Sequence, residues 1–139
     1  MTDLENARRL LEGHTLALCK GEDVVLSDKR GIAPMLELND SGRDLRGYSA
    51  ADVVVGKAAA MLFSKAGIAA VYAKTLSRPA LKYLETQKIP VFYDTLADNI
   101  INRDKTDICP MEKAVLATDD EEKAVELLKE KFRRLNEGK

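Results

Sequence analysis

The chain has almost no excess of charge of either sign, and it contains few cysteines. Lys and Arg number 22 against 23 Asp and Glu, so no basic field predicts a nucleic-acid partner. The two cysteines, Cys19 and Cys109, are too few and too far apart in sequence to form a disulfide framework. We therefore expect a cytoplasmic protein that lives in a reducing compartment and does not bind nucleic acid.

Long hydrophobic runs and targeting signals are also missing. No apolar run approaches the roughly 18 residues that a membrane span needs, so no membrane partner is expected. The first residues place Asp3, Glu5 and Arg8 on a helical pattern instead of a basic start and an apolar core, which predicts no signal peptide. The 139 residues show no repeat and suit a single domain over residues 1–139.

The most apolar stretch of the chain spans residues 49–66. Ser49 and Asp52 have the spacing of a capping box, and Gly67 stands where a left-handed residue ends a helix. Nearly every side chain between them is apolar, which a helix with one buried face does not explain. The pattern predicts a buried central helix that begins after Ser49.

Shorter patterns flank this stretch on both sides. Hydrophobic periodicity, turn residues and caps predict a hairpin first and two parallel strands later. The predicted strands are residues 15–20, 24–27, 68–73 and 89–93, and the other predicted helices are residues 2–13, 34–38, 77–86, 96–101, 109–117 and 118–135. This order predicts an α/β fold, a three-layer α-β-α sandwich with a mixed sheet, an N-terminal antiparallel hairpin and parallel later strands.

Two motifs within this order resemble those of a known family. They are residues 55–60, Val-Gly-Lys-Ala-Ala-Ala, and residues 107–115, Asp-Ile-Cys-Pro-Met-Glu-Lys-Ala-Val. With them the chain resembles a small uncharacterised family of bacterial and archaeal proteins whose fold is that of the cytidine deaminases. The resemblance covers almost the whole chain and implies a cytidine-deaminase-like fold, but it implies no reaction.

Cytidine deaminases hold zinc at two helix starts, through a His-x-Glu or Cys-x-Glu motif and a Pro-Cys-x-x-Cys motif. We place residues 53–57 and 77–82 at these two starts, and neither segment contains histidine or cysteine. His14 and Cys19 are five residues apart, which would point them to opposite faces of one strand. The sequence therefore predicts no metal site and no other cofactor.

A cleft without its metal can still bind a ligand, because helix starts at the carboxyl ends of strands offer free amides. We expect Arg46 and Arg78 to hold a phosphate or carboxylate and Tyr48 to stack on a base. In the alternative, the arginines are merely solvated, Tyr48 only closes its loop over the following helix, and Lys57 runs its stem along apolar surface to water. The predicted ligand-binding residues are Arg46, Tyr48, Ser49, Lys57, Ser77 and Arg78.

Cys109 is the most specific chemical feature of the sequence. Pro110 suits a first helical position, so Cys109 is the predicted cap, with its sulfur near free amides that would stabilise a thiolate. Arg103 or Lys113 would add to that effect. Against this, free cysteine is commonly a small buried hydrophobe, and no histidine lies nearby in sequence to act as a base.

Three functions follow as hypotheses, and they leave open whether the protein is an enzyme. The first is non-catalytic binding of a small anionic ligand, a nucleotide-like one included, in a deaminase-like cleft without zinc. The second is an enzyme that uses Cys109 as its catalytic residue. The third is a structural homodimer in which the central helix or a strand edge meets a second copy. A thiol exposed to the cleft would favour the second hypothesis, and a buried thiol the first.

Overall fold

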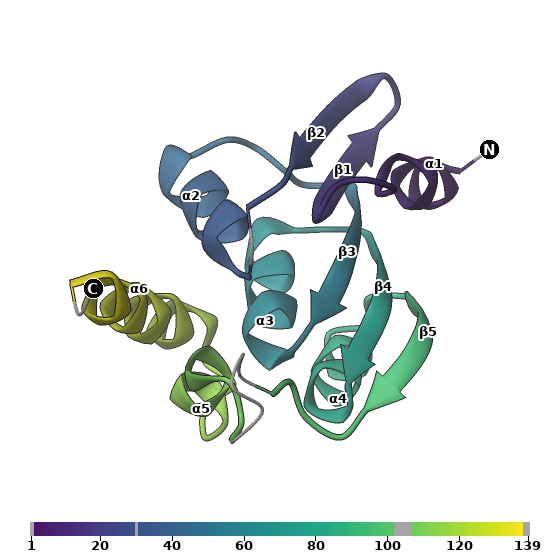
Figure 1. Cartoon of the computed structure of the whole chain (residues 1–139). Helices are drawn as coiled ribbons and strands as arrows, with labels where there is room; N and C mark the ends of the chain where they lie inside the picture. Colours follow the sequence, from purple (N-terminus) through teal and green to yellow (C-terminus); the bar gives the residue numbers. More distant parts are fainter. Residues whose placement is uncertain (1, 30, 102–106, 138–139) are drawn as a thin grey trace.

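The computed structural model of the chain describes residues 2–29, 31–101 and 107–137. Its centre is a five-stranded sheet in the order β2-β1-β3-β4-β5 (Figure 1). The strands are β1 Leu16–Lys20, β2 Asp23–Ser27, β3 Ser49–Val55, β4 Ala70–Ser77 and β5 Val91–Ala97. β1 is antiparallel to β2 and β3, whereas β3, β4 and β5 are parallel. The mixed sheet with an N-terminal hairpin and parallel later strands is therefore confirmed.

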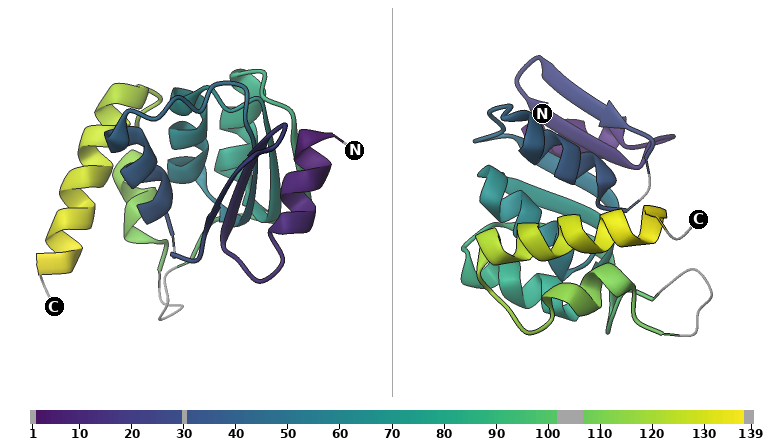
Figure 2. Two further views of the ribbon diagram at one scale, coloured as in Figure 1. Left: turned by 90° about the horizontal axis from the view of Figure 1, so that it is seen from above. Right: turned by 90° about the vertical axis from the view of Figure 1, so that its left-hand side faces the viewer.

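Helices cover both faces of the sheet (Figure 2). They are α1 Asp3–Leu10, α2 Ala33–Ser41, α3 Lys57–Ala66, α4 Arg78–Thr86, α5 Pro110–Val115 and α6 Glu121–Glu137. α1 lies on one face and α2, α3 and α4 on the other, while α6 packs on the outer side of α3. Within the described ranges, no helix is long and apolar enough to cross a membrane.

The prediction of a helix beginning after Ser49 is wrong. Ser49 starts β3, where it pairs with Cys19 of β1 and Ala70 of β4, and α3 begins only at Lys57. A central strand that is covered on both faces is apolar on every side, as a buried helix is, so the pattern did not separate the two. The predicted end of the helix is confirmed, since Gly67 adopts a left-handed conformation with φ of 80°.

Two apolar clusters lie on the two faces of the sheet. On one face, Ala7 and Leu11 pack against Cys19, Ala51 and Tyr72. The larger cluster lies on the other face and is centred on α3, whose residues from Lys57 to Phe63 are all buried. Lys57 is thus the one cation in a buried run of small and apolar side chains, and its position is where the candidate site begins.

The chain after β4 agrees with the predictions in part. Ser77 caps α4 as predicted, because its Oγ accepts a hydrogen bond of 3.1 Å from the Ala80 amide. The helix predicted over residues 96–101 is wrong, since β5 continues to Ala97 and Ile101 forms a bridge with Ile108. The cap predicted at Thr118 is also wrong. Asp120 fills that role for α6 by accepting from the Lys123 amide.

Candidate functional site

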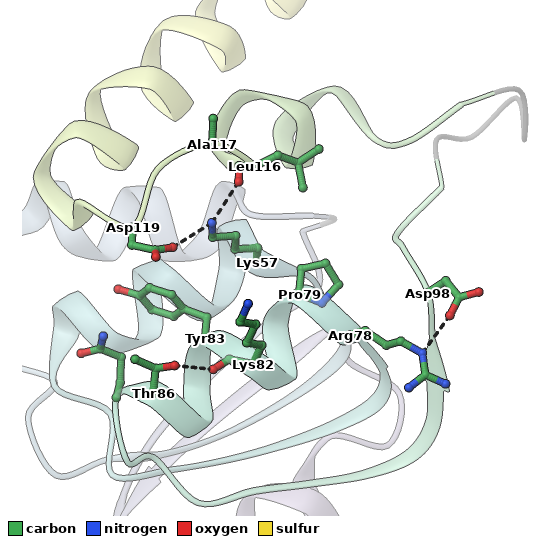
Figure 3. Close-up of a pocket in the computed structure, with 11 residues that line it drawn as sticks. Lys57, Arg78, Pro79, Lys82, Tyr83, Thr86, Asp98, Leu116, Ala117 and Asp119 are labelled. Carbon is green, nitrogen blue, oxygen red and sulfur yellow. Dashed lines mark hydrogen bonds and ion pairs between the residues drawn. The ribbon is translucent and has the colours of Figure 1, made fainter.

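A pocket of about 570 Å³ lies where the parallel strands end, between the starts of α3 and α4 and the connection from α5 to α6 (Figure 3). We call it the Lys57 pocket. Lys57 follows β3 after one glycine, and Arg78 and Asp98 directly follow β4 and β5. The carboxyl edge of a parallel sheet is where open α/β folds bind ligands, because successive strands deliver side chains to one place.

Lys57 is the buried cation of this pocket, with 8% of its surface exposed. Its Nζ lies 2.9 Å from Oδ1 of Asp119 and donates to the carbonyl of Leu116 at 3.2 Å (Figure 3). The Asp119 side chain is 80% exposed, so the partner of a buried ammonium group is a carboxylate that faces water.

Two further cations reach the same pocket from α4. The Nε of Arg78 donates to Oδ1 of Asp98 at 2.8 Å, and both side chains are well exposed. Figure 3 shows Lys82 extending from α4 toward the side of the pocket where Lys57 lies. No ion pair holds Lys82 among the residues that the structure describes. Three cations against two carboxylates leave one positive charge in excess.

The structure places the other predicted ligand residues elsewhere. Ser77 is fully buried, and its hydroxyl is used for the α4 cap. Arg46, Tyr48 and Ser49 lie at the opposite end of β3 from Lys57. A single cleft that joins Arg46 and Tyr48 with Arg78 is therefore not what the fold forms.

Arg46 and Tyr48 are already occupied by neighbours in the chain. Two nitrogens of Arg46 donate to the two oxygens of Asp44, each at 3.0 Å, and this hydrogen bonding lowers the pKa of Asp44 to about 2. The Tyr48 hydroxyl donates to Asp23, and the ring has Lys20 over it at 5.9 Å from its centroid. Tyr48 thus closes its loop, which is the alternative that we set against base stacking.

A second pocket, of about 430 Å³, surrounds the start of α5. We call it the Asp52 pocket, because the Asp52 side chain lines it from the central strand together with Cys109 and Glu112 from α5. Cys109 is half-buried and is the N-cap of α5 as predicted, but its sulfur makes no capping hydrogen bond. His14 is held at 2.6 Å by Asp28, and it is not among the side chains that line this pocket. Arg103 lies outside the described residues.

Glu112 holds the start of α3, and sequence reasoning missed it. Only 5% of the residue is exposed, and its two carboxylate oxygens accept hydrogen bonds from the amides of Lys57 at 2.6 Å and Ala58 at 2.8 Å. Burial raises the pKa of Glu112, and these two amide hydrogen bonds counter part of that rise. The indirect signal was Gly56, an N-cap with no side chain to satisfy the helix start.

Comparisons with known proteins agree with this fold. The profile of the family described as TM1506, Domain of unknown function (DUF1893), matches residues 7–132. The chain belongs to the DUF1893 family. It is also similar to the crystal structure of a DUF1893 family protein, TM1506 from Thermotoga maritima. The sequence identity is 30% and the TM-score 0.85, over 94% of this chain and 91% of that one. No curated protein matches the chain.

In this DUF1893 protein, α5 joins the two pockets. Its Glu112 binds the Lys57 amide beside the Asp52 pocket, and the carbonyl of Leu116 after its end binds the Lys57 Nζ in the Lys57 pocket. One lysine is therefore held through both its backbone and its side chain by the same short segment. In the described part of the chain, no group of three His, Cys, Asp or Glu side chains is placed to hold a metal ion.

The two cysteines of this DUF1893 chain are expected to differ in reactivity. Cys19 is fully buried within β1, and burial raises the pKa of its thiol, whereas Cys109 is half-buried and lines a pocket. Alkylation of Cys19 needs a local opening of the sheet, and each 1.4 kcal/mol of opening costs about tenfold in rate. We expect iodoacetamide to label native Cys109 at least about tenfold faster, as read by mass spectrometry. Faster labelling of Cys19 would contradict the cap assignment of Cys109.

Proposed function

We propose that this protein binds a small anionic ligand in the Lys57 pocket without catalysing its conversion. The observation that carries the proposal is the buried ammonium group of Lys57, whose carboxylate partner, Asp119, faces solvent. A phosphate or carboxylate can take the place of Asp119 against Lys57 without any loss of burial. Hydrogen bonds between ionised groups are about twice as strong as neutral ones, which favours an anion here.

The neighbouring side chains have complementary roles in this proposal. Lys57 supplies a point charge at the inner end of the pocket, and Arg78 can present a planar fork to two oxygens of one group. Lys82 adds a charge from the next turn of α4. The Tyr83 hydroxyl donates to Glu121, and burial together with that carboxylate raises the pKa of Tyr83, so the hydroxyl stays neutral. The volume of about 570 Å³ suits a metabolite of nucleotide size.

The cysteine enzyme and the homodimer are each supported by one observation. The cysteine enzyme is supported by the position of Cys109 in a pocket with two carboxyl groups, although the described lining holds no imidazole to act as a base. The homodimer is supported by the edge strand β5, where Phe92 and Tyr93 are 58% and 41% exposed. A cytidine-deaminase-like fold and a cytoplasmic location also stay predictions, which the mixed sheet and the composition support.

Inorganic phosphate is expected to stabilise the protein against heat. A ligand that binds only the folded state raises its stability by mass action, by about 2.7 kcal/mol at a hundred times the dissociation constant. We expect phosphate to raise the melting temperature above that in chloride at equal ionic strength. The Arg78→Gln/Lys82→Gln variant should lose most of this increment, because both exposed cations are removed while Lys57 keeps its structural contacts.

The matched control is Arg46→Gln. Arg46 is also an exposed arginine bound to one carboxylate, but it lies at the other end of β3. This variant should keep the full phosphate increment. If all three proteins shift by the same amount, phosphate acts only as a general salt and the proposed site is wrong.

A further inference from the structure

Asp52 is a carboxyl group on the central strand of the sheet with apolar neighbours on both sides. In the register of the sheet it lies between Leu16 of β1 and Ala73 of β4, and both neighbours belong to the main core. Among the described residues, only backbone amides donate hydrogen bonds to the Asp52 side chain. The hydrogen bond from the Val54 amide is long, at 3.4 Å. An ionised carboxylate in such surroundings costs free energy unless it is paired. The fold itself gives no reason for an acid at this position.

The pocket that Asp52 lines gives a reason for an acidic residue at this position, which the fold alone does not give. Its volume of about 430 Å³ lies within the range of small-molecule sites. The described lining contains no lysine, arginine or aromatic side chain, and its walls are mainly aliphatic, with Ile32, Val54, Ile100 and Met111 among them. Burial raises the pKa of Asp52 to about 7, as expected for a carboxyl group that lacks a cation.

The other acid of the pocket is not available to a ligand. Both oxygens of Glu112 are used by the amides at the start of α3. Asp52 is therefore the one carboxyl group in the described lining whose oxygens are largely unused. Within the described lining, an anion would meet two acidic groups and no counter-charge, whereas a cation would meet a carboxylate without a cationic partner.

We infer that the Asp52 pocket binds a small organic cation, an aliphatic amine whose ammonium group pairs with Asp52 while its hydrocarbon part contacts the aliphatic walls. The hydrocarbon removes apolar surface from water, and the ammonium group supplies the positive counter-charge that the partly buried carboxylate lacks. This site is distinct from the Lys57 pocket in both its lining and the sign of its ligand, so the inference does not depend on anion binding there.

The test compares cyclohexylammonium with cyclohexanol, which has the same ring without the charge. Methyl NMR spectra of the full-length protein report on the walls, since Ile32, Val54, Ile100 and Met111 all carry methyl groups. We expect the amine to shift these signals and to bind at least about tenfold more tightly than the alcohol, a difference of about 1.4 kcal/mol. Asp52→Asn, which keeps the shape and removes the charge, should bring the two affinities to within about threefold.

A second variant tests the pocket separately from the charge. Ala59→Leu fills the space from α3 and leaves Asp52 in place, so it should abolish the shifts caused by both compounds. The inference is wrong if the amine leaves the wall methyl groups unshifted in the wild-type protein. It is also wrong if amine and alcohol bind equally well, or if Asp52→Asn retains the preference for the amine.

Discussion

Replacing Glu112 with alanine is expected to destabilise the protein by about 2 to 6 kcal/mol, because two buried amides lose their acceptors and each costs about 1 to 3 kcal/mol. The amides of Lys57 and Ala58 lie at the buried start of α3, and Gly56 has no side chain that could replace the carboxylate. The loss also removes one of the two hydrogen-bonded links between the α5 segment and Lys57, leaving the one from the Lys57 Nζ to the Leu116 carbonyl. Urea unfolding of wild type and variant gives the difference directly.

A matched control for this variant is Glu130→Ala. Glu130 pairs with Arg133 and Arg134 on the surface of α6, where an exposed ion pair contributes less than about 1 kcal/mol. Its loss should therefore be small. If Glu112→Ala costs no more than Glu130→Ala, Glu112 does not hold the start of α3.

Gly56→Ala tests the same contact from the opposite side. A Cβ on Gly56 would lie 1.9 Å from Oε1 of Glu112, so the carboxylate must leave the helix start. The backbone of Gly56 is extended, with φ of −101°, so the requirement for glycine comes from this close approach. The effects of Gly56→Ala and Glu112→Ala should be far from additive in the double variant, because each removes the same interaction.

The segment from Ser49 to Lys57 shows how far the sequence could predict the fold. Local signals that depend on one residue were reliable, as with the left-handed Gly67 and the Ser77 cap. The run of apolar residues before Lys57 was not a reliable signal. A strand that is buried on both faces lacks the alternation of apolar and polar residues that distinguishes a strand from a helix. Its three consecutive valines, which favour strands, were the better local signal.

The wrong helix start at Ser49 also explains why the predicted ligand-binding residues do not lie together in the structure. A helix that starts at Ser49 would place Arg46 and Tyr48 beside Arg78, which is why the sequence predicts one site. With the true start at Lys57, the seven residues of β3 separate the two groups by roughly 20 Å. Lys57 and Arg78 do share a pocket. Glu112 could not be predicted, because its contact with Lys57 spans 55 residues and no local pattern specifies it.

Asp52→Asn is expected to change the pH dependence of stability. The pKa of Asp52 rises from an ordinary 3.8 to about 7 in the folded protein, because burial disfavours the charged form. Between these two values the folded state binds the extra proton, so this group lowers the free energy of unfolding as the pH rises from about 4 to about 7. At 1.36 kcal/mol per pKa unit, the full effect is about 4 kcal/mol as an upper limit, since the side chain is only partly buried.

The variant lacks this titration, so the sign of its effect depends on pH. Below about pH 3 the acid is mostly neutral in both states, and asparagine should have little effect. Near pH 8 the wild-type protein must bury a charge, and Asp52→Asn should be more stable by about 1 to 4 kcal/mol. Carboxyl groups with lowered pKa values, such as Asp44 and Asp107, act in the opposite direction, but they are common to both proteins and cancel in the difference. A difference between the two proteins that stays constant from pH 3 to pH 8 in urea unfolding would mean that the fold does not raise the pKa of Asp52.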